Sequence, residues 1–194
     1  LDYNLYLTSI CMCNELILTN RLLCKENFLV HLEKLCKGKP YGIVLREKDL
    51  TETFYEELAR EVLSLCSFYD VSCILHTFCD VAKRLSCKKI HLSFEHFKNL
   101  TREEKNYFTT IGVSCHTLEE IFFVEQQGAT YATISPVFKT TCKPYAVPLG
   151  LEFLENVCKK IQLPLFALGG IGDANKSAVL KTGVFGIARM SYWM

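Results

Sequence analysis

The sequence lacks the features that mark several classes of protein. No apolar run approaches membrane-spanning length, and the amino end has no basic region before an apolar one. An excess of one charge is missing as well, because 22 Lys and Arg residues stand against 21 Asp and Glu residues and leave a net charge of +1. These absences argue against a membrane or nucleic-acid partner.

Cysteine pairs with metal-binding spacing are also missing. The 11 cysteines are odd in number, scattered, and include no CxxC pair. We interpret most of them as small apolar core residues or free thiols in a reducing cytoplasm. A cytoplasmic protein without a metal site is therefore expected.

Short apolar segments alternate with amphipathic ones along the chain. The 194 residues are 49% hydrophobic, which suits a single domain over 1–194 with a substantial core. The alternation recurs about eight times and predicts a parallel α/β fold. No GxGxxG turn follows the first strand, which favours a compact (β/α)8 barrel over an open sheet. The predicted strands are 16–20, 42–46, 72–75, 89–92, 111–114, 131–135, 163–168 and 184–188.

Helix starts are visible between several of these strands. The helix after the second strand should place Phe54, Leu58, Val62 and Leu65 against the sheet, since they recur at helical spacing. Three Thr-x-x-Glu pairs predict helix caps. They are Thr53 with Glu56, Thr101 with Glu104, and Thr117 with Glu120.

The barrel is expected to lack its last helix. Only Ser191, Tyr192, Trp193 and Met194 follow the eighth strand. The seam between the first and last strands then needs another cover. We hypothesise that the N-terminal extension, residues 1–15, or a second subunit supplies it, and we expect a homo-oligomer, most simply a dimer.

The stretch 163–191 predicts a phosphate site. Gly169 and Gly170 end the seventh strand, where glycine lets backbone N–H groups approach a ligand. Loops after strands seven and eight of such barrels commonly bind phosphate. We therefore expect Gly169, Gly170 and the Met190–Ser191 backbone to hold a phosphate. The Arg189 guanidinium is expected to bind it directly, the alternative being that this side chain extends to the surface.

From about residue 16 to 191 the chain resembles the thiamine phosphate synthase and TenI family of small (β/α)8 barrels. The matching pieces are LREK (45–48), GVSCHTLEE (112–120), YATISPVFKTTCKP (131–144), PLGLEFL (148–154), LGGI (168–171) and GIARMS (186–191). The resemblance implies thiamine biosynthesis and a small-molecule thiazole phosphate as ligand.

The family contains two reactions, and the first is thiamine phosphate synthesis. Synthases join a pyrimidine pyrophosphate to a thiazole phosphate with Mg²⁺, and the resemblance implies that Arg46, Lys48 and Lys143 would then face the pyrophosphate. The synthase pattern has Gln where Val44 stands, and Asn-Asp where His76-Thr77 stands. It also has Gln and Asp just after the fourth strand, where residues 91–95 of this chain read HLSFE. The carboxylates for Mg²⁺ are thus largely absent, and Mg²⁺ is expected only if the chain is a synthase.

The second reaction is tautomerisation of a carboxythiazole phosphate, which needs an acid/base group and no metal. The resemblance implies that His116 moves the proton, and a His suits this role near neutral pH. The alternative is that His116 only ties its loop to the helix at Thr117. We expect a metal-independent thiazole tautomerase, an isomerase without a cofactor. The alternatives are the synthase, a transferase, and a non-catalytic thiamine-ligand binding or regulatory protein.

The remaining candidates would bind the substrate. Arg46 and Lys48 would hold its carboxylate or a second anionic group, unless they form a solvated turn. His76 and Ser135 stand at predicted strand ends, where the alternatives are a packed histidine and a plain strand end. Lys143 lies on the polar loop 139–148.

Overall fold

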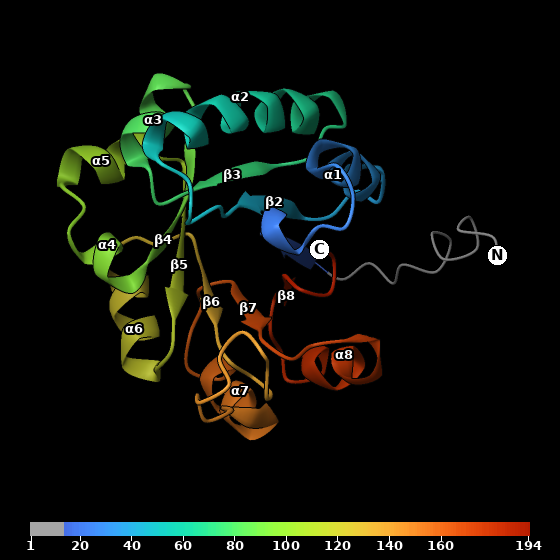
Figure 1. Cartoon of the computed structure of the whole chain (residues 1–194). Coiled ribbons are helices and arrows are strands. Elements are labelled where there is room, and N and C mark those ends of the chain that lie inside the picture. The colour runs from blue at the N-terminus through green and yellow to red at the C-terminus, as the bar shows by residue number, and fades with distance from the viewer. Residues whose placement is uncertain (1–13) are drawn as a thin grey trace.

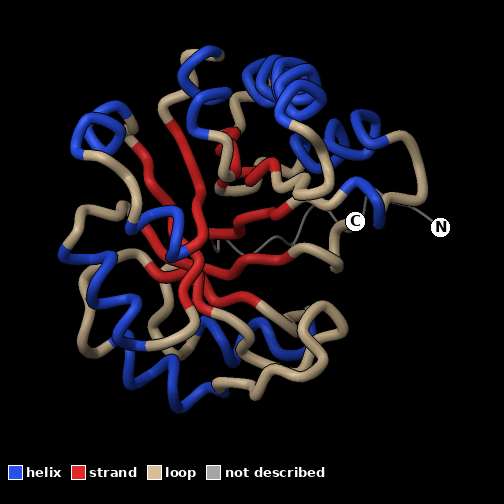
Figure 2. Tube along the Cα trace, turned by 60° about the vertical axis from the view of Figure 1, so that its left-hand side comes forward, coloured by secondary structure: helices blue, strands red, loops and turns tan. Residues whose placement is uncertain are grey.

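The computed structural model describes residues 14–194, and its eight parallel strands form a closed barrel (Figures 1 and 2). Each strand pairs with the next along the chain, and β8 closes the ring on β1, with Ile17 beside Arg189. The predicted barrel is confirmed. Its strands are β1 (Asn14–Leu18), β2 (Gly42–Leu45), β3 (Cys73–His76), β4 (Lys89–Ser93), β5 (Thr110–Cys115), β6 (Tyr131–Ile134), β7 (Leu165–Leu168) and β8 (Gly186–Arg189).

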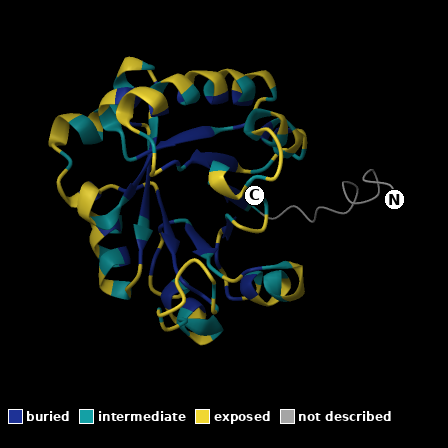
Figure 3. Ribbon diagram, viewed as in Figure 1, coloured by how far each residue is buried: buried dark blue, intermediate teal, exposed yellow. Residues whose placement is uncertain are grey.

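Helices surround the barrel and leave its strands buried (Figure 3). They are α1 (Phe28–Lys37), α2 (Glu52–Phe68), α3 (Cys79–Arg84), α4 (Phe94–Lys98), α5 (Arg102–Tyr107), α6 (Leu118–Gln126), α7 (Gly150–Cys158) and α8 (Asp173–Leu180), with a short 3-10 helix η3 (Arg21–Leu23) after β1. None of the helices among residues 14–194 is long and apolar enough to span a membrane. The cysteines in this part of the chain are free thiols, most of them buried or half-buried.

A turn through 191–193 follows β8. Trp193 Nε1 donates to Glu15 Oε1 of β1 at 2.5 Å, and the His31 imidazole hydrogen-bonds the Trp193 carbonyl. The carboxyl end therefore covers part of the seam itself. Of the two covers hypothesised from the sequence, residues 1–13 lie outside the described residues, and the second subunit stays a prediction.

The interior of the barrel is filled by its own side chains. Aromatic rings of Tyr131 and Phe166 point inward and meet edge to face at 5.5 Å between centroids. A Cβ at position 112 would lie 2.0 Å from Tyr131 Cζ, so Gly112 is the residue that admits this ring. The inner cluster comprises Leu16, Leu18, Val44, Ile74, Tyr131, Phe166 and Ala188. This filled interior confines the ligand site to one end of the barrel.

The α2 helix differs from the prediction. Its buried residues are Tyr55, Ala59, Val62 and Cys66, and Phe54 is 60% exposed. The helix is turned because the Tyr55 hydroxyl donates to the Leu45 carbonyl at 2.7 Å and accepts from His76 N at 2.8 Å. These bonds join the carboxyl ends of β2 and β3. The Thr53 cap is wrong, since α2 begins after Thr51.

The other two predicted caps are present. Thr101 and Glu104 form the complete capping box at α5. Thr117 Oγ1 accepts from Glu120 N at 3.2 Å and caps α6, while the Glu120 carboxylate binds the N–H of His116 at 2.6 Å. The start of α6 therefore fixes the backbone of His116.

Candidate active site

A cavity of about 570 Å³ opens at the carboxyl ends of the strands. All of the residues predicted from the sequence line it: Arg46, Lys48, His76, His116, Ser135, Lys143, Gly169, Gly170, Arg189, Met190 and Ser191. They come from the ends of six strands (β2, β3, β5, β6, β7 and β8) and from the 139–148 loop. Parallel strands bring these ends together, which is why residues far apart in sequence meet at one mouth.

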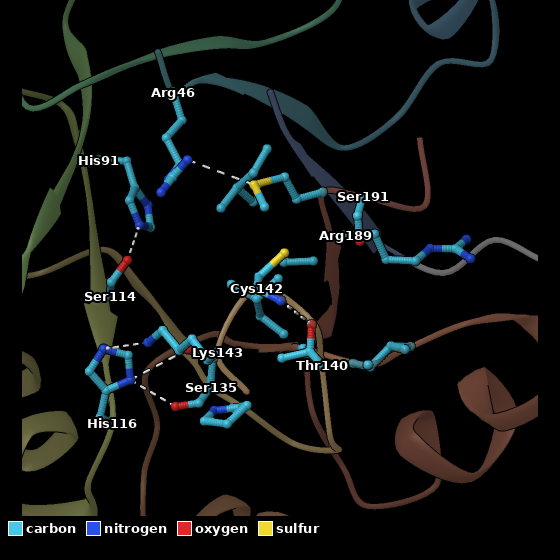
Figure 4. Close-up of a pocket in the computed structure, with 18 of the residues that line it drawn as sticks. Arg46, His91, Ser114, His116, Ser135, Thr140, Cys142, Lys143, Arg189 and Ser191 are labelled. Carbon is cyan, nitrogen blue, oxygen red and sulfur yellow. Dashed lines mark hydrogen bonds between the residues drawn. The ribbon is translucent and has the colours of Figure 1, made fainter. Parts of the chain in front are cut away.

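The His116 imidazole is held between a carbonyl and an ammonium group (Figure 4). Its Nδ1 lies 2.7 Å from the Ser135 carbonyl, which can only accept, so Nδ1 carries the proton. Nε2 then presents its lone pair and accepts from Lys143 Nζ at 3.2 Å. The ring is therefore oriented with its basic nitrogen toward the Lys143 ammonium group on the cavity wall.

A buried carboxylate supports the turn that carries Arg46 and Lys48. Glu47 is 1% exposed and accepts from Thr19 Oγ1 at 2.5 Å and from Arg21 N at 2.9 Å. Thr19 Oγ1 in turn accepts from Arg46 N at 2.9 Å. The turn is thus an ordered part of the barrel rim, which argues against the solvated turn considered from the sequence.

Three cations face the cavity without an ion pair. Among residues 14–194, no carboxylate lies within ion-pair distance of Arg46, Lys48 or Lys143. Burial lowers the pKa of Lys48, and the Arg46 charge lowers it further. Burial also lowers the pKa of Lys143, followed by the charges of Lys48 and Arg46, while Glu120 acts in the opposite direction. Like charges gathered in this way favour an anion between them.

The diglycine at the end of β7 is needed for packing. Gly170 has φ +68°, and a Cβ there would lie 2.6 Å from the Lys139 carbonyl oxygen. Gly169 has φ +102°, and a Cβ there would lie 3.0 Å from Pro136 Cα. The loop after β6 therefore packs directly on β7. The N–H groups of Gly170 and Ser191 donate to no other group in the described part of the chain, which leaves them available to a ligand.

The Arg189 guanidinium is bonded to two carboxylates. Its Nε and Nη2 donate to Glu15 at 2.6 and 2.8 Å, and its Nη1 donates to Asp173 at 3.1 Å. The side chain extends away from His116 and Lys143 (Figure 4). Three of its five N–H donors are thus held by carboxylates, which favours an indirect role over the direct phosphate binding expected from the sequence.

Two imidazoles form the floor of the cavity. The rings of His76 and His91 stack with centroids 6.0 Å apart. Burial lowers the pKa of His91 to about 3, with Arg46 adding to the effect. Burial and then the neighbouring His91 lower the pKa of His76 well below its usual value. Both rings are therefore neutral at pH 7, and His76 lines the cavity as predicted.

Sequence reasoning misses Ser114, although the two-residue alternation of β5 places it on the face of His116. The His91 ring hydrogen-bonds the Tyr131 hydroxyl through Nδ1 and Ser114 Oγ through Nε2, both at 2.8 Å. Thr133 Oγ1 adds a longer bond to Ser114 at 3.4 Å. These bonds fix the position of the Ser114 hydroxyl on the cavity wall.

The cavity offers two carboxylates to a Mg²⁺ ion, and both already have partners in the structure. Glu95 and Glu120 line the cavity, but Glu120 accepts the N–H of His116 and Glu95 pairs with Lys98 at 3.2 Å. Among residues 14–194, no group of three or more His, Cys, Asp and Glu residues could hold a metal ion. Mg²⁺ prefers oxygen ligands arranged as an octahedron, and the neutral floor at His76 supplies none.

Comparison with known proteins identifies the family. The model described as thiamine monophosphate synthase matches residues 16–192. A putative thiamine-phosphate synthase 2 of Aquifex aeolicus is 35% identical over 177 residues, 91% of this chain and 95% of that protein. The thiamine-phosphate synthase of Clostridium acetobutylicum is 30% identical over 192 residues, 98% of this chain and 86% of that protein.

A solved structure agrees with the sequence matches. The thiamine phosphate pyrophosphorylase of Pyrococcus furiosus superposes with a TM-score of 0.79 at 27% identity, covering 92% of this chain and 85% of its own. The names of these relatives favour the synthase over the tautomerase among the activities considered from the sequence. Barrel, cavity and matches together lead to one conclusion: the chain belongs to the thiamine monophosphate synthase and TenI family.

Proposed function

We propose that this chain is an enzyme of thiamine biosynthesis that binds a thiazole phosphate and tautomerises its carboxythiazole form without a metal. The observation that carries the proposal is the orientation of His116. Its Nδ1–H is fixed on the Ser135 carbonyl, so Nε2 is the base, and it faces a cavity with three unpaired cations. The absence of a fitting Mg²⁺ ligand set among the described residues supports the metal-free reaction.

In the proposed reaction, the unpaired N–H groups of Gly170 and Ser191 hold the phosphate, with Gly169 and Met190 beside them. Arg46 and Lys48 bind the ring carboxylate. His116 Nε2 removes the proton from the ring carbon, and the electron pair moves through the ring to the exocyclic double bond. The imidazolium returns the proton to the exocyclic carbon. No atom or electron is gained or lost, and the product ring is aromatic.

Lys143 and Ser135 assist the proton transfer through the two ring nitrogens of His116. Lys143 Nζ contacts Nε2, and the Ser135 carbonyl accepts from Nδ1. The Lys143 ammonium leaves Nε2 for the substrate carboxylate when the ring carbon approaches the base. The Ser135 carbonyl stabilises the imidazolium, because it accepts the Nδ1 proton in both protonation states of the ring. His76 and Ser114 contact the ring from the floor, His76 as a neutral group and Ser114 through its hydroxyl.

Thiamine phosphate synthase is the second candidate, and the names of the relatives favour it. Arg46, Lys48 and Lys143 would then face a pyrophosphate. The weak point is the metal, because Val44, His76-Thr77 and the 91–95 run lack the polar and acidic residues of the synthase pattern. A non-catalytic protein that binds thiamine ligands would use the same cavity with no turnover. For all three candidates we keep the proposal of a homo-oligomer, which solution mass tests.

Product analysis separates the three candidates. The chain is incubated with carboxythiazole phosphate, and separately with the pyrimidine pyrophosphate plus thiazole phosphate, each with Mg²⁺ and with EDTA. The proposal expects an aromatic thiazole product in EDTA, its loss in His116→Gln, and its retention in His96→Gln, which removes an exposed imidazole outside the cavity. Thiamine phosphate formed only with Mg²⁺ would establish the synthase, and binding without any product would establish the non-catalytic protein.

A further inference from the structure

Arg189 and Glu15 form a buried ion pair beside the proposed phosphate site, and two more charged residues join it. Its side chain is 3% exposed and that of Glu15 is 10% exposed. Besides its bonds to Glu15, Arg189 reaches Asp173 at 3.1 Å, and Lys176 Nζ lies 3.7 Å from Glu15. The proposed reaction does not use this buried charge.

The charges of this cluster cancel. Glu15 and Asp173 contribute −2, and Arg189 and Lys176 contribute +2, so the sum is zero. Asp173 is the first residue of α8 and directly follows Gly172, which lines the cavity. Without the guanidinium the sum would be −1, with a carboxylate at the helix end where the phosphate would lie. A negative charge there opposes the positive end of the helix and repels an anion.

The same cluster fixes the segment that carries the Ser191 amide. The Tyr192 hydroxyl donates to Asp173 at 2.5 Å, and the Tyr192 ring lies over the guanidinium, 3.8 Å from Arg189 Cζ. Trp193 Nε1 donates to Glu15, and Trp193 N donates to the Met190 carbonyl at 3.0 Å. The turn 191–193 is thus bound on both sides, so the Ser191 N–H has a fixed direction.

We propose that Arg189 is a positioning residue of the phosphate site, which neutralises Glu15 and Asp173 and clamps the turn 191–193 so that the site accepts an anion. This inference rests on the phosphate site of the proposed function, but not on the tautomerase reaction. It explains why a buried guanidinium stands at this strand end without touching the phosphate.

The test compares a charged with an uncharged ligand. Binding of inorganic phosphate, thiazole phosphate and the unphosphorylated thiazole alcohol is measured by calorimetry for wild type and Arg189→Met. We expect the variant to bind both phosphate ligands about tenfold more weakly, the scale of one unpaired charge, and the thiazole alcohol within a factor of two. Equal loss for all three ligands, or no loss, would overturn the inference.

A second variant keeps the test decisive if Arg189→Met does not fold. Asp173→Asn removes one negative charge at an exposed position, and its single amide oxygen keeps one of the two acceptors that Arg189 Nη1 and the Tyr192 hydroxyl use. We expect it to bind inorganic phosphate two- to fivefold more tightly, by the same charge argument. Unchanged or weaker binding contradicts the inference. A wild-type chain that binds thiazole phosphate without turnover contradicts the tautomerase alone, and one that binds no phosphate contradicts both.

Discussion

Replacing His91 by glutamine should remove a pH dependence of stability that the barrel floor creates. His91 is fully buried, and its pKa falls from 6.5 to about 3 in the folded chain. Because the folded pKa is depressed, the unfolded chain binds this proton more readily than the folded one. The contribution of neutral His91 is complete above pH 6.5 and is lost as the pH falls from there toward 3.

The magnitude follows from the two pKa values. At pH 5.0 the unfolded imidazole is protonated and the folded one is neutral, and 5.0 lies 1.5 units below 6.5. At 1.36 kcal/mol per unit, wild type should lose about 2 kcal/mol from this residue between pH 7.5 and 5.0. The value depends little on the folded pKa as long as that stays below 4. His76, whose pKa is also lowered by burial, causes a further loss of stability as the pH falls. Wild type and His91→Gln both contain His76, so this contribution cancels in the difference between them.

Urea unfolding followed by fluorescence of Trp193, the single tryptophan, measures this at both pH values. His91→Gln should be less stable than wild type at pH 7.5, and the gap should narrow by about 2 kcal/mol at pH 5.0. His96→Gln, which removes an exposed imidazole, should keep the slope of wild type. A gap between wild type and His91→Gln that is equal at both pH values would refute the buried neutral histidine.

Two further predictions concern the rim of the cavity. Gly170→Ala places a Cβ 2.6 Å from the Lys139 carbonyl and should reduce phosphate affinity at least about tenfold in calorimetry. Gly128→Ala is its matched control, since Gly128 also has a positive φ but no atom within 4 Å of its Cβ; it should only lose about 1 kcal/mol of stability. Glu47→Gln replaces one accepting oxygen by an NH2 group next to the donors Thr19 Oγ1 and Arg21 N. It should lower the free energy of unfolding by about 2–4 kcal/mol in urea unfolding. A loss below about 1 kcal/mol would contradict the anchoring role of this carboxylate.

The barrel and the residues that line its cavity can be predicted from the sequence, because both depend on the alternation of apolar strands and amphipathic helices along the chain. The ends of parallel strands share one edge, so residues at predicted strand ends were bound to meet there. The predicted face of α2 is confirmed at Val62, and Leu58 and Leu65 pack against the core, but Phe54 is exposed. Apolar spacing selects Phe54, whereas the Tyr55 hydroxyl finds two buried backbone partners that spacing does not reveal.

The role of Arg189 could not be predicted for a different reason. Its partner Glu15 is 174 residues away in the sequence, and only closure of β8 on β1 brings the two together. In the sequence, Glu15 and Arg189 appear only as two separate charged residues in or next to predicted strands, and nothing there indicates that they pair. Ser114 is not found from the sequence because only the folded chain brings it within hydrogen-bond distance of His91, 23 residues before it.

The most direct test of the central claim is turnover of carboxythiazole phosphate in deuterium oxide with EDTA, followed by NMR. Wild type and His96→Gln should deliver the aromatic thiazole with deuterium at the exocyclic carbon, and His116→Gln should not. Failure of wild type to convert the substrate in EDTA, or conversion by His116→Gln at the wild-type rate, would contradict a metal-free proton transfer by His116.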